Sequence, residues 1–424
     1  MTRPVQNSHQ DVLRSVERLH RILEAAKLLN STLDLEELTT IILRIVREEV
    51  GTDRGTVFVI DREHNQLRSI VAQGIGDTEI VVPIGQGVAG TVGESGETIN
   101  LPDAYRDPRF DSSFDALLEY QTKDIYCMPI VNRVGDIVGV LELLNRSRPI
   151  TIEDEEFLAG VSVHVGLALE NARMHREIVE KRKIEQELLL AREIQENFYP
   201  SFPEIYGGVQ IAASTEMCEA VGGDYLGYFP LKDGRFLVTV GDVSGKGIGA
   251  ALVMTSLHAT CRALVNHVHS IEHITNILNQ TLVETTSAST FVTLMIALVD
   301  PVAGRLHYIS AGHNPPVIVK PAGDAALLDG VSGPPVGLFS HLAYKREIRS
   351  IDPGSVLVIY TDGVNEAENG KDEQFGMERL VQVVTDSRKS TASHIHASIR
   401  TALKEFVGDT PSHDDATFIV LKFS

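Results

Sequence analysis

Four aspartates in the second half of the sequence stand where apolar, strand-like runs begin or end. Asp224 follows two glycines in VGGDYLGYF, Asp242 ends FLVTVGD, Asp362 follows VLVIYT, and Asp414 precedes ATFIVLKF. Carboxylates that meet at one edge of a sheet repel one another unless cations neutralise them. Oxygen ligands without a nearby His or Cys cluster favour Mg²⁺ or Mn²⁺ over zinc. Since a pair of such ions is the usual device for phosphoryl displacement by water, the pattern predicts metal-dependent phosphate-ester hydrolysis.

The stretch VTVGDVSGKGIGAAL places a glycine-rich turn between a predicted strand and a predicted helix. A nucleotide-binding P-loop needs four residues between its first Gly and the Gly-Lys pair, followed by Ser or Thr. Here only Asp242, Val243 and Ser244 intervene, and a glycine follows Lys246, so the spacing excludes a P-loop. We expect the glycines to let the backbone turn tightly and bring a carbonyl to a cation. Lys246 either attracts a phosphorylated substrate or is a solvated surface lysine.

The elements around these positions must bring the carboxylates together. The Asp-Gly pair at 233–234 predicts a hairpin, so Asp224 and Asp242 lie on neighbouring strands and can approach each other. Ser244 is not expected to be a nucleophile, because no His-Asp pair is placed to activate it. His313 is expected to shape a turn, and a role in substrate binding or proton transfer stays open.

The motifs GGDY, GDVSGKG, SAGHNPP, YTDGVNEA and HDDATF follow one another through residues 201–424. They resemble the metal-dependent serine/threonine phosphatases of the protein phosphatase 2C type, and within these the bacterial SpoIIE/RsbU-like branch. The resemblance implies an α-β-β-α sandwich with a site for two Mn²⁺ or Mg²⁺ ions at one end. The four aspartates would be the catalytic residues, and Asp242 would bridge both ions. The implied metal ligands are Asp224, Asp242, Val243 through its carbonyl, Asp362 and Asp414, with Asp415 a less favoured ligand.

The first part of the chain has a different pattern. Asp34 is placed to cap a helix that Gly51 ends, and the short β-rich runs GTVFVI, LRSIVAQG, DIYCMPIV and DIVGVLELLN follow. Strands with helices before and after them predict an α+β domain whose antiparallel sheet carries helices on one face. The glycine-rich passage VPIGQGVAGTVGESGETINLPDA is not expected to be one regular element throughout.

This passage and the later stretch LELLNRSRPITIEDEEFL resemble a GAF domain, a sensory module of signalling proteins. Asn145, Asp154 and Glu155 fit the signature of its cyclic-nucleotide-binding members, whereas Arg146 and Ile150 replace the Lys and Phe of that signature. We therefore favour a structural role for the three matching residues over a role in ligand binding. The input to this domain, a small molecule or a protein, is left open.

A helix is predicted from about residue 153 to residue 198 between the two parts, and its core, residues 171–198, contains no Gly or Pro. A narrow apolar stripe on a long helix is typical of packing against a partner helix, so we favour a coiled coil in a homodimer over a solvated single helix. The stripe consists of Met174, Ile178, Ile184, Leu188, Ala191 and Ile194. A further helical pattern near the N-terminus comes from Val12, Val16, Leu19, Leu23 and Ala26.

We therefore expect an N-terminal helical segment over 1–20, a GAF-like sensory domain over 21–172, a coiled-coil linker over 173–200 and a phosphatase domain over 201–424. The net charge of −20 argues against a nucleic-acid or anionic membrane partner. The three scattered cysteines indicate a reducing compartment. Without an apolar run of about 20 residues or a signal-peptide pattern, the expected location is the cytoplasm.

The function expected from these parts is that of a sensor-regulated phosphatase acting on phosphoserine or phosphothreonine. The resemblance to the SpoIIE/RsbU-like branch implies a phosphorylated STAS-domain antagonist of an anti-sigma factor as its substrate. Two alternatives are a catalytically inactive phosphatase-fold scaffold and a GAF-based ligand-binding switch. The complete set of acidic residues favours the enzyme, because an inactive relative would usually lose one of them.

Overall fold

The computed structural model describes residues 20, 23–24, 27–28, 32, 34–72, 79–117, 120–267, 270–330 and 332–424. The chain divides into two compact units, Met1–Lys183 and Ile184–Ser424, each of which is described by itself. The N-terminal helical segment predicted over residues 1–20 lies outside the described residues except for His20.

The first unit is built on a six-stranded antiparallel sheet with the order β3-β2-β1-β6-β5-β4. Its strands are β1 (Thr52–Asp61), β2 (Gln66–Ala72), β3 (Val81–Pro83), β4 (Ile99–Leu101), β5 (Ile125–Val131) and β6 (Ile137–Arg146). Its helical elements are α2 (Leu35–Val50), α3 (Gly87–Ser95), the 3₁₀ turn η1 (Ala104–Arg106), α4 (Ser113–Leu117) and the first part of α5 (Ile152–Glu196).

Helix α2 begins and ends at the predicted residues. The Asp34 carboxylate accepts hydrogen bonds from the backbone N–H groups of Glu36 and Glu37, both at 3.0 Å. Gly51 ends the helix in the left-handed conformation with φ of 75°. The Glu37 carboxylate accepts a hydrogen bond from the Thr32 hydroxyl at 2.6 Å. The sequence signals at both ends of this helix therefore have a direct structural basis.

The two faces of this sheet carry different helices. Leu141 and Leu143 pack with the buried residues of α2 and α5, but the prediction of helices on one face is wrong, because helices cover both faces. Val140, which points the other way, packs with buried residues of α3. The glycine-rich passage thus contains a helix that covers the second face. Its close approach to the strand before it requires glycine, because a Cβ at Gly90 would lie 2.3 Å from the Pro83 carbonyl oxygen.

The second unit contains two antiparallel sheets. One has five strands in the order β15-β12-β11-β10-β9, and the other has six in the order β14-β13-β16-β17-β8-β7. The strands are β7 (Ile205–Tyr206), β8 (Val209–Glu216), β9 (Tyr225–Pro230), β10 (Phe236–Val243), β11 (Val292–Asp300), β12 (Arg305–Ala311), β13 (Val317–Val319), β14 (Ala325–Leu327), β15 (Glu347–Ser350), β16 (Val356–Tyr360) and β17 (Ala416–Phe423). The helices that begin in this unit are α6 (Gly247–Val265), α7 (Ile271–Thr285), α8 (Asp362–Asn365), α9 (Gly376–Ser387) and α10 (Ala392–Val407).

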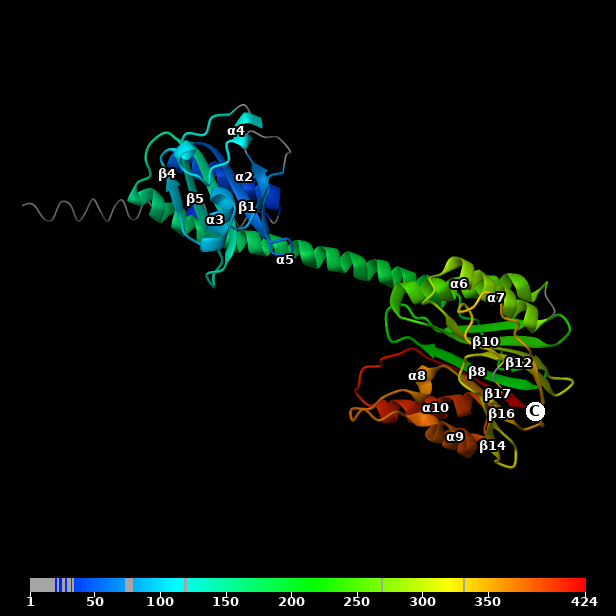
Figure 1. Cartoon of the computed structure of the whole chain (residues 1–424). Helices are drawn as coiled ribbons and strands as arrows, with labels where there is room; N and C mark the ends of the chain where they lie inside the picture. Colours follow the sequence, from blue (N-terminus) through cyan, green and yellow to red (C-terminus); the bar gives the residue numbers. More distant parts are fainter. Residues whose placement is uncertain are drawn as a thin grey trace, which may run out of the picture. The chain divides into compact units, whose positions relative to one another are not determined.

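These elements form four layers, with the sheets face to face and helices on both outer sides (Figure 1). Helices α6 and α7 pack on the five-stranded sheet around buried residues such as Met254 and Leu278. Helices α9 and α10 cover the six-stranded sheet around residues such as Leu380 and Ile395. A third cluster, which includes Phe236 and Ile419, fills the space between the sheets. The predicted α-β-β-α sandwich is confirmed.

Helix α5 is continuous over 45 residues. Near its start, Leu158, Val161 and Val165 are buried in the core of the first unit. Near its end, Gln195 is buried in the second unit. Among the described residues one helix, α6, is long and apolar enough to cross a membrane by those measures alone, and its buried residues pack on the five-stranded sheet.

Candidate active site

The predicted hairpin brings two of the aspartates to one end of the five-stranded sheet. Tyr225 of β9 pairs with Gly241 of β10 in an antiparallel register, so Asp224 and Asp242 lie at the same end of these strands. The turn that joins the strands contains Gly234 with φ of 86°. The strong Asp-Gly turn signal in the sequence therefore positions both carboxylates.

The six-stranded sheet contributes its loops through the ends of β16 and β17. The Thr361 hydroxyl, directly after β16, donates a hydrogen bond of 2.8 Å to the Asp224 carboxylate. The same hydroxyl oxygen accepts a bond of 3.0 Å from the backbone N–H of Thr417 in β17. Thr361 thus connects the two sheets beneath the site. Asp362 begins α8 next to it.

Asp415 is buried and holds the loop before β9. Its carboxylate accepts hydrogen bonds from the backbone N–H groups of Cys218 and Gly223, both at 2.8 Å. A Cβ at Gly222 would lie 2.3 Å from the same carboxylate. On the other side of Asp415, a Cβ at Gly363 would lie 1.9 Å from its carbonyl oxygen. The first glycine of the GGD motif and the glycine of the TDG motif are therefore required by the close approach of Asp415.

The carboxylates of the site influence one another electrostatically. Burial, followed by the charges of Asp362, Asp414 and Asp415, raises the pKa of Asp242 to about 7. Burial, followed by the charge of Asp414, raises the pKa of Asp362 above its usual range. Burial also raises the pKa of Asp224 well above that range. Several acidic groups thus share a region that disfavours their charged forms.

Lys246 gives this region a positive charge. Its ammonium group lies 3.4 Å from the carboxylate of Asp414 and also donates to the carbonyl of His413. A small cavity beside it is lined by Asp242, Asp414 and Gly247, among others. Lys246 is about half exposed, so it can move toward a ligand as well as toward Asp414.

The donor groups fit Mg²⁺ or Mn²⁺. Among the described residues, no three His, Cys, Asp or Glu side chains lie close enough together to enclose one ion. Mg²⁺ is usually held by one or two carboxylates and keeps several of its waters. The Val243 carbonyl oxygen lies close to the loop before β9, since a Cβ at Gly223 would lie 3.2 Å from it. The predicted ligands are all hard oxygen donors, which these ions prefer, and the Cys218 thiol that lines the same cavity is not among them.

Two further candidates have structural partners. The Ser244 hydroxyl accepts a hydrogen bond of 2.9 Å from the Phe291 backbone N–H, so it shapes the loop after β10. His313 is buried, and burial lowers its pKa to about 4. Its Nδ1 lies 3.0 Å from the hydroxyl of Thr293, the residue that pairs with Asp242 in the sheet. His313 is therefore a neutral residue of the layer beneath Asp242.

Sequence reasoning missed Gln195, which contacts the loop of the site from the last turn of α5. Its amide donates to the Gly222 carbonyl at 2.6 Å and accepts from the Gly222 N–H at 3.0 Å. Close by, the Tyr199 hydroxyl donates to the backbone carbonyl of Asp224 at 3.1 Å. The sequence did hold one signal for the burial of Gln195. Leu188, Ala191 and Gln195 follow one another at helical spacing, so Gln195 lies on the same face of the helix as the two apolar residues.

The signature residues of the GAF-like stretch stabilise loops. Asn145 has φ of 53°, and its side chain accepts from the Lys123 N–H at 2.6 Å and donates to the Gln121 carbonyl at 2.8 Å. Asp154 accepts from the Thr151 N–H at 2.8 Å and from Arg148 at 2.9 Å. Neither residue lines the cavity of about 410 Å³ that lies between the sheet and the segments around α3 and α4. These contacts support a structural role.

Comparisons with known proteins give two family matches. Residues 34–169 match the GAF domain, and residues 232–424 match the family described as stage II sporulation protein E (SpoIIE). Protein IcfG of Synechocystis is 31% identical over 263 residues, which are 55% of this chain and 41% of that protein. A dual 3',5'-cyclic-AMP and -GMP phosphodiesterase 11A of Takifugu rubripes is 36% identical over 166 residues, 36% of this chain and 18% of that protein. The chain thus spans less than half of the length of either relative.

The solved structure of the SiaA-PP2C domain of Pseudomonas aeruginosa is similar in fold. It superposes with a TM-score of 0.52 and 22% sequence identity, covering 58% of this chain and 99% of that domain. At this level of identity the likeness concerns the fold, and it agrees with the four-layer arrangement described above.

Proposed function

Because the chain joins a GAF domain to a SpoIIE-type domain with the fold of PP2C phosphatases, we propose that it is a sensor-regulated, metal-dependent protein serine/threonine phosphatase. The observation that carries the proposal is the gathering of acidic loops from both sheets at one end of the sandwich. There burial and the neighbouring carboxylates raise the pKa of Asp242 to about 7. Binding of divalent cations would relieve this repulsion.

We assign the cation site to four aspartates and one backbone carbonyl. Asp242 would bridge two ions, and the Val243 carbonyl would serve one of them. Asp224 would serve one ion, directly or through water, and Asp362 and Asp414 would serve the other. When bound, two Mn²⁺ or Mg²⁺ ions activate water and stabilise the charge that develops in phosphoryl displacement. Each of the four aspartates is thereby a proposed catalytic residue.

The other residues of the chain would orient this set. Asp415 fixes the backbone before Asp224 through two N–H groups, and Thr361 fixes the Asp224 carboxylate. Lys246 is exposed beside Asp414 and can bind a phosphate oxygen at the mouth of the site. Because the loop is held in one conformation, it would keep the cations and the phosphoester aligned for reaction.

The proposed substrate is a phosphoserine or phosphothreonine on a folded protein. Resemblance to the SpoIIE/RsbU-like branch favours a STAS-domain antagonist of an anti-sigma factor, in the cytoplasm. Dephosphorylation would let the antagonist bind its anti-sigma partner and release a sigma factor. Small phosphate esters should react slowly, because they lack the protein surface that aligns the reacting groups.

Control is proposed to pass through α5. Several apolar side chains of the predicted stripe are exposed on this helix, which supports pairing with a second copy: Met174, Ile178, Ile184 and Ile194. Leu188 and Ala191 are instead half-buried within the second unit. The contact between Gln195 and Gly222 links the end of the helix to the loop before Asp224. A ligand would act only through its different affinities for two arrangements of these helices.

The test is a phosphate-release assay with phosphorylated STAS-domain proteins from the same genome, with and without Mn²⁺. We expect Mn²⁺-dependent release from at least one of them, at a catalytic efficiency well above that for p-nitrophenyl phosphate. A chain that binds such a protein but releases no phosphate at any Mn²⁺ concentration would instead be the inactive scaffold. Equal efficiency on all substrates would contradict the proposed specificity.

A further inference from the structure

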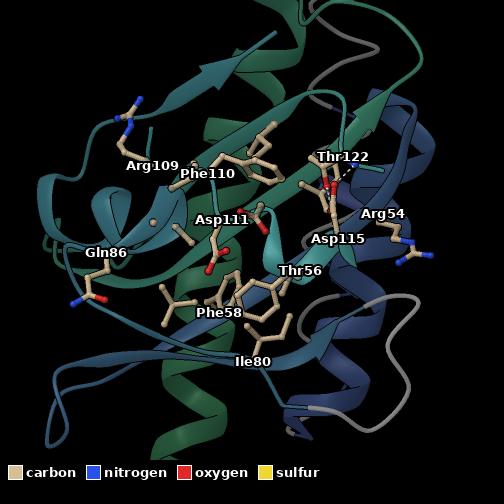
Figure 2. A pocket seen from close by; sticks show the side chains of 18 of the residues that line it. Arg54, Thr56, Phe58, Ile80, Gln86, Arg109, Phe110, Asp111, Asp115 and Thr122 are labelled. Atoms are coloured by element: carbon tan, nitrogen blue, oxygen red, sulfur yellow. Dashed lines mark hydrogen bonds between the residues drawn. The ribbon is translucent and has the colours of Figure 1, made fainter. Parts of the chain in front are cut away.

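The first unit contains a cavity of about 410 Å³ between its sheet and the segments around α3 and α4 (Figure 2). This volume lies within the range of small-molecule sites. Its floor is formed by β1 and β6, where Thr56 pairs with Glu142 and Phe58 pairs with Val140. The alternation of side chains along these strands directs Thr56, Phe58 and Glu142 to the face that bears the cavity.

Glu142 has no partner in the described part of this unit. No hydrogen bond or ion pair joins its carboxyl group to another described residue, and burial alone raises its pKa to about 7. Asp115, which lines the same cavity, accepts bonds from the Thr122 N–H and hydroxyl, both at 2.7 Å, and from the Tyr105 hydroxyl at 2.9 Å. Glu142 is partly exposed toward the cavity, and a carboxyl group that faces apolar side chains without a partner is costly. Its oxygens are therefore available to a group inside the cavity.

The charged side chains around the cavity make its interior acidic. The exposed Asp111 carboxylate accepts from the Ser113 N–H at 2.9 Å and points toward the cavity, whereas the guanidinium groups of Arg54 and Arg109 point away from the centre (Figure 2). Arg54 lies over the ring of Tyr120 at 3.8 Å, and Arg109 pairs with Asp107 at 2.7 Å. An anion in the interior would meet the carboxyl groups of Asp111, Asp115 and Glu142 and no inward-pointing guanidinium group. A cation is favoured there.

The walls favour a flat ligand. Phe58 and Phe110 lie on opposite sides of the cavity, with Ile80 beside Phe58 (Figure 2). Aromatic rings stack on planar groups and attract cations to their faces. A planar ring with a positively charged group at one end would contact these residues and reach the carboxyl group on the floor.

We propose that this cavity binds a planar aromatic cation of the amidine type, with two N–H donors on the Glu142 carboxylate and its ring between Phe58 and Phe110. The two donors of an amidine on one carbon match the two oxygens of a carboxylate, as a guanidinium group does. Asp111 adds a second negative charge that favours such a ligand over a neutral one of the same shape. The inference concerns binding alone and does not depend on the proposed phosphatase activity.

The test compares three probes of nearly one shape on the full chain by isothermal titration calorimetry: 2-naphthamidine, 2-naphthamide and 2-naphthoate. They carry a positive charge, no charge and a negative charge. We expect the amidine to bind at least tenfold more tightly than the amide, and the naphthoate to show no saturable binding. Cyclic GMP and cyclic AMP serve as anionic ligands of another shape. Tighter binding of naphthoate or of either cyclic nucleotide than of the amidine would overturn the proposal.

Substitutions assign the interaction to the cavity. Glu142→Gln keeps the shape of the side chain but removes its charge, and should weaken amidine binding at least tenfold while changing amide binding little. Glu97→Gln, an exposed position in the same unit, is the matched control and should leave both unchanged. If Glu142→Gln does not fold, as judged by circular dichroism, Asp111→Asn takes its place with an expected loss of severalfold. Amidine affinity that is insensitive to the cavity substitution would refute the assignment.

Discussion

Replacing Gln195 with alanine should loosen the loop that carries Asp224. The substitution removes both hydrogen bonds to Gly222 and leaves a buried N–H and a buried carbonyl without a partner. Each unsatisfied group costs about 1–3 kcal/mol, so the closed loop should lose about 2–6 kcal/mol relative to open forms. The lower limit alone corresponds to a roughly 30-fold increase in the open population. Gln195→Glu should have an intermediate effect, because a carboxylate accepts from the N–H but cannot donate to the carbonyl.

Hydrogen–deuterium exchange measures this opening directly. In Gln195→Ala the segment around Gly222 should exchange at least 30-fold faster than in the wild type, as the lower energetic limit requires. The Mn²⁺ concentration that gives half of the maximal phosphate-release rate should rise in parallel, since an open loop displaces Asp224. Both measurements are made on the full chain.

Gln186→Ala provides the matched control, since Gln186 lies on the same helix but is exposed. Its exchange and Mn²⁺ dependence should equal those of the wild type. If Gln195→Ala behaves like this control in both measurements, the contact has no part in holding the loop. A faster exchange with an unchanged Mn²⁺ dependence would show that the loop opens without affecting the proposed metal site.

Further predictions concern both units. Asp242→Asn should reduce Mn²⁺-dependent phosphate release to less than a few percent, while the thermal unfolding of the metal-free chain should be unchanged or shifted upward, because a buried charge is removed. In the wild type, the first unit should lose stability as pH rises from about 4.5 to 7, because the native state binds an extra proton on Glu142 in that window. Glu142→Gln should remove this loss, and the resulting difference in unfolding free energy at pH 8, about 3 kcal/mol at most, can be measured by calorimetry. Gly363→Ala should destabilise the second unit by about 2–4 kcal/mol in urea unfolding, because its Cβ would clash with the Asp415 carbonyl. Ile178→Lys should shift a dimer toward monomer in sedimentation while keeping basal Mn²⁺-dependent activity, and a wild type that sediments as a monomer would contradict the pairing of α5.

The sequence was most informative where a signal is local. Asp34 and Gly51 marked the ends of α2, and the Asp-Gly pair at 233–234 marked the β9–β10 hairpin, because capping and turn chemistry involve residues close in sequence. The family motifs then gave the arrangement of the two sheets. The assignment of Asp242 and Asp362 as metal ligands stays a prediction, to be tested by the substitutions and the assay above.

Interactions between distant residues were not accessible in this way. Nothing in the local pattern indicated that Gln195 would meet Gly222, or that the Thr361 hydroxyl would meet Asp224, 137 positions away. In the sequence Glu142 is one polar residue in an apolar strand. Its lack of a hydrogen-bond partner depends on the cavity that α3 and α4 complete, which the strand pattern does not show. Burial and partners of a polar side chain follow from tertiary packing, which periodicity alone does not specify.

The two backbone hydrogen bonds of Asp415 have a consequence for how the protein would acquire its metal. A structural zinc site folds only when its ion binds, because the ligands are otherwise unheld. Here Cys218 and Gly223 are held by a carboxylate of the protein itself, so the loop before Asp224 can keep its shape without an ion. Cations could then leave and return while the chain stays folded. The proposed enzyme would thus respond reversibly to the free Mn²⁺ or Mg²⁺ concentration around it, with metal supply acting as an input separate from the sensory domain.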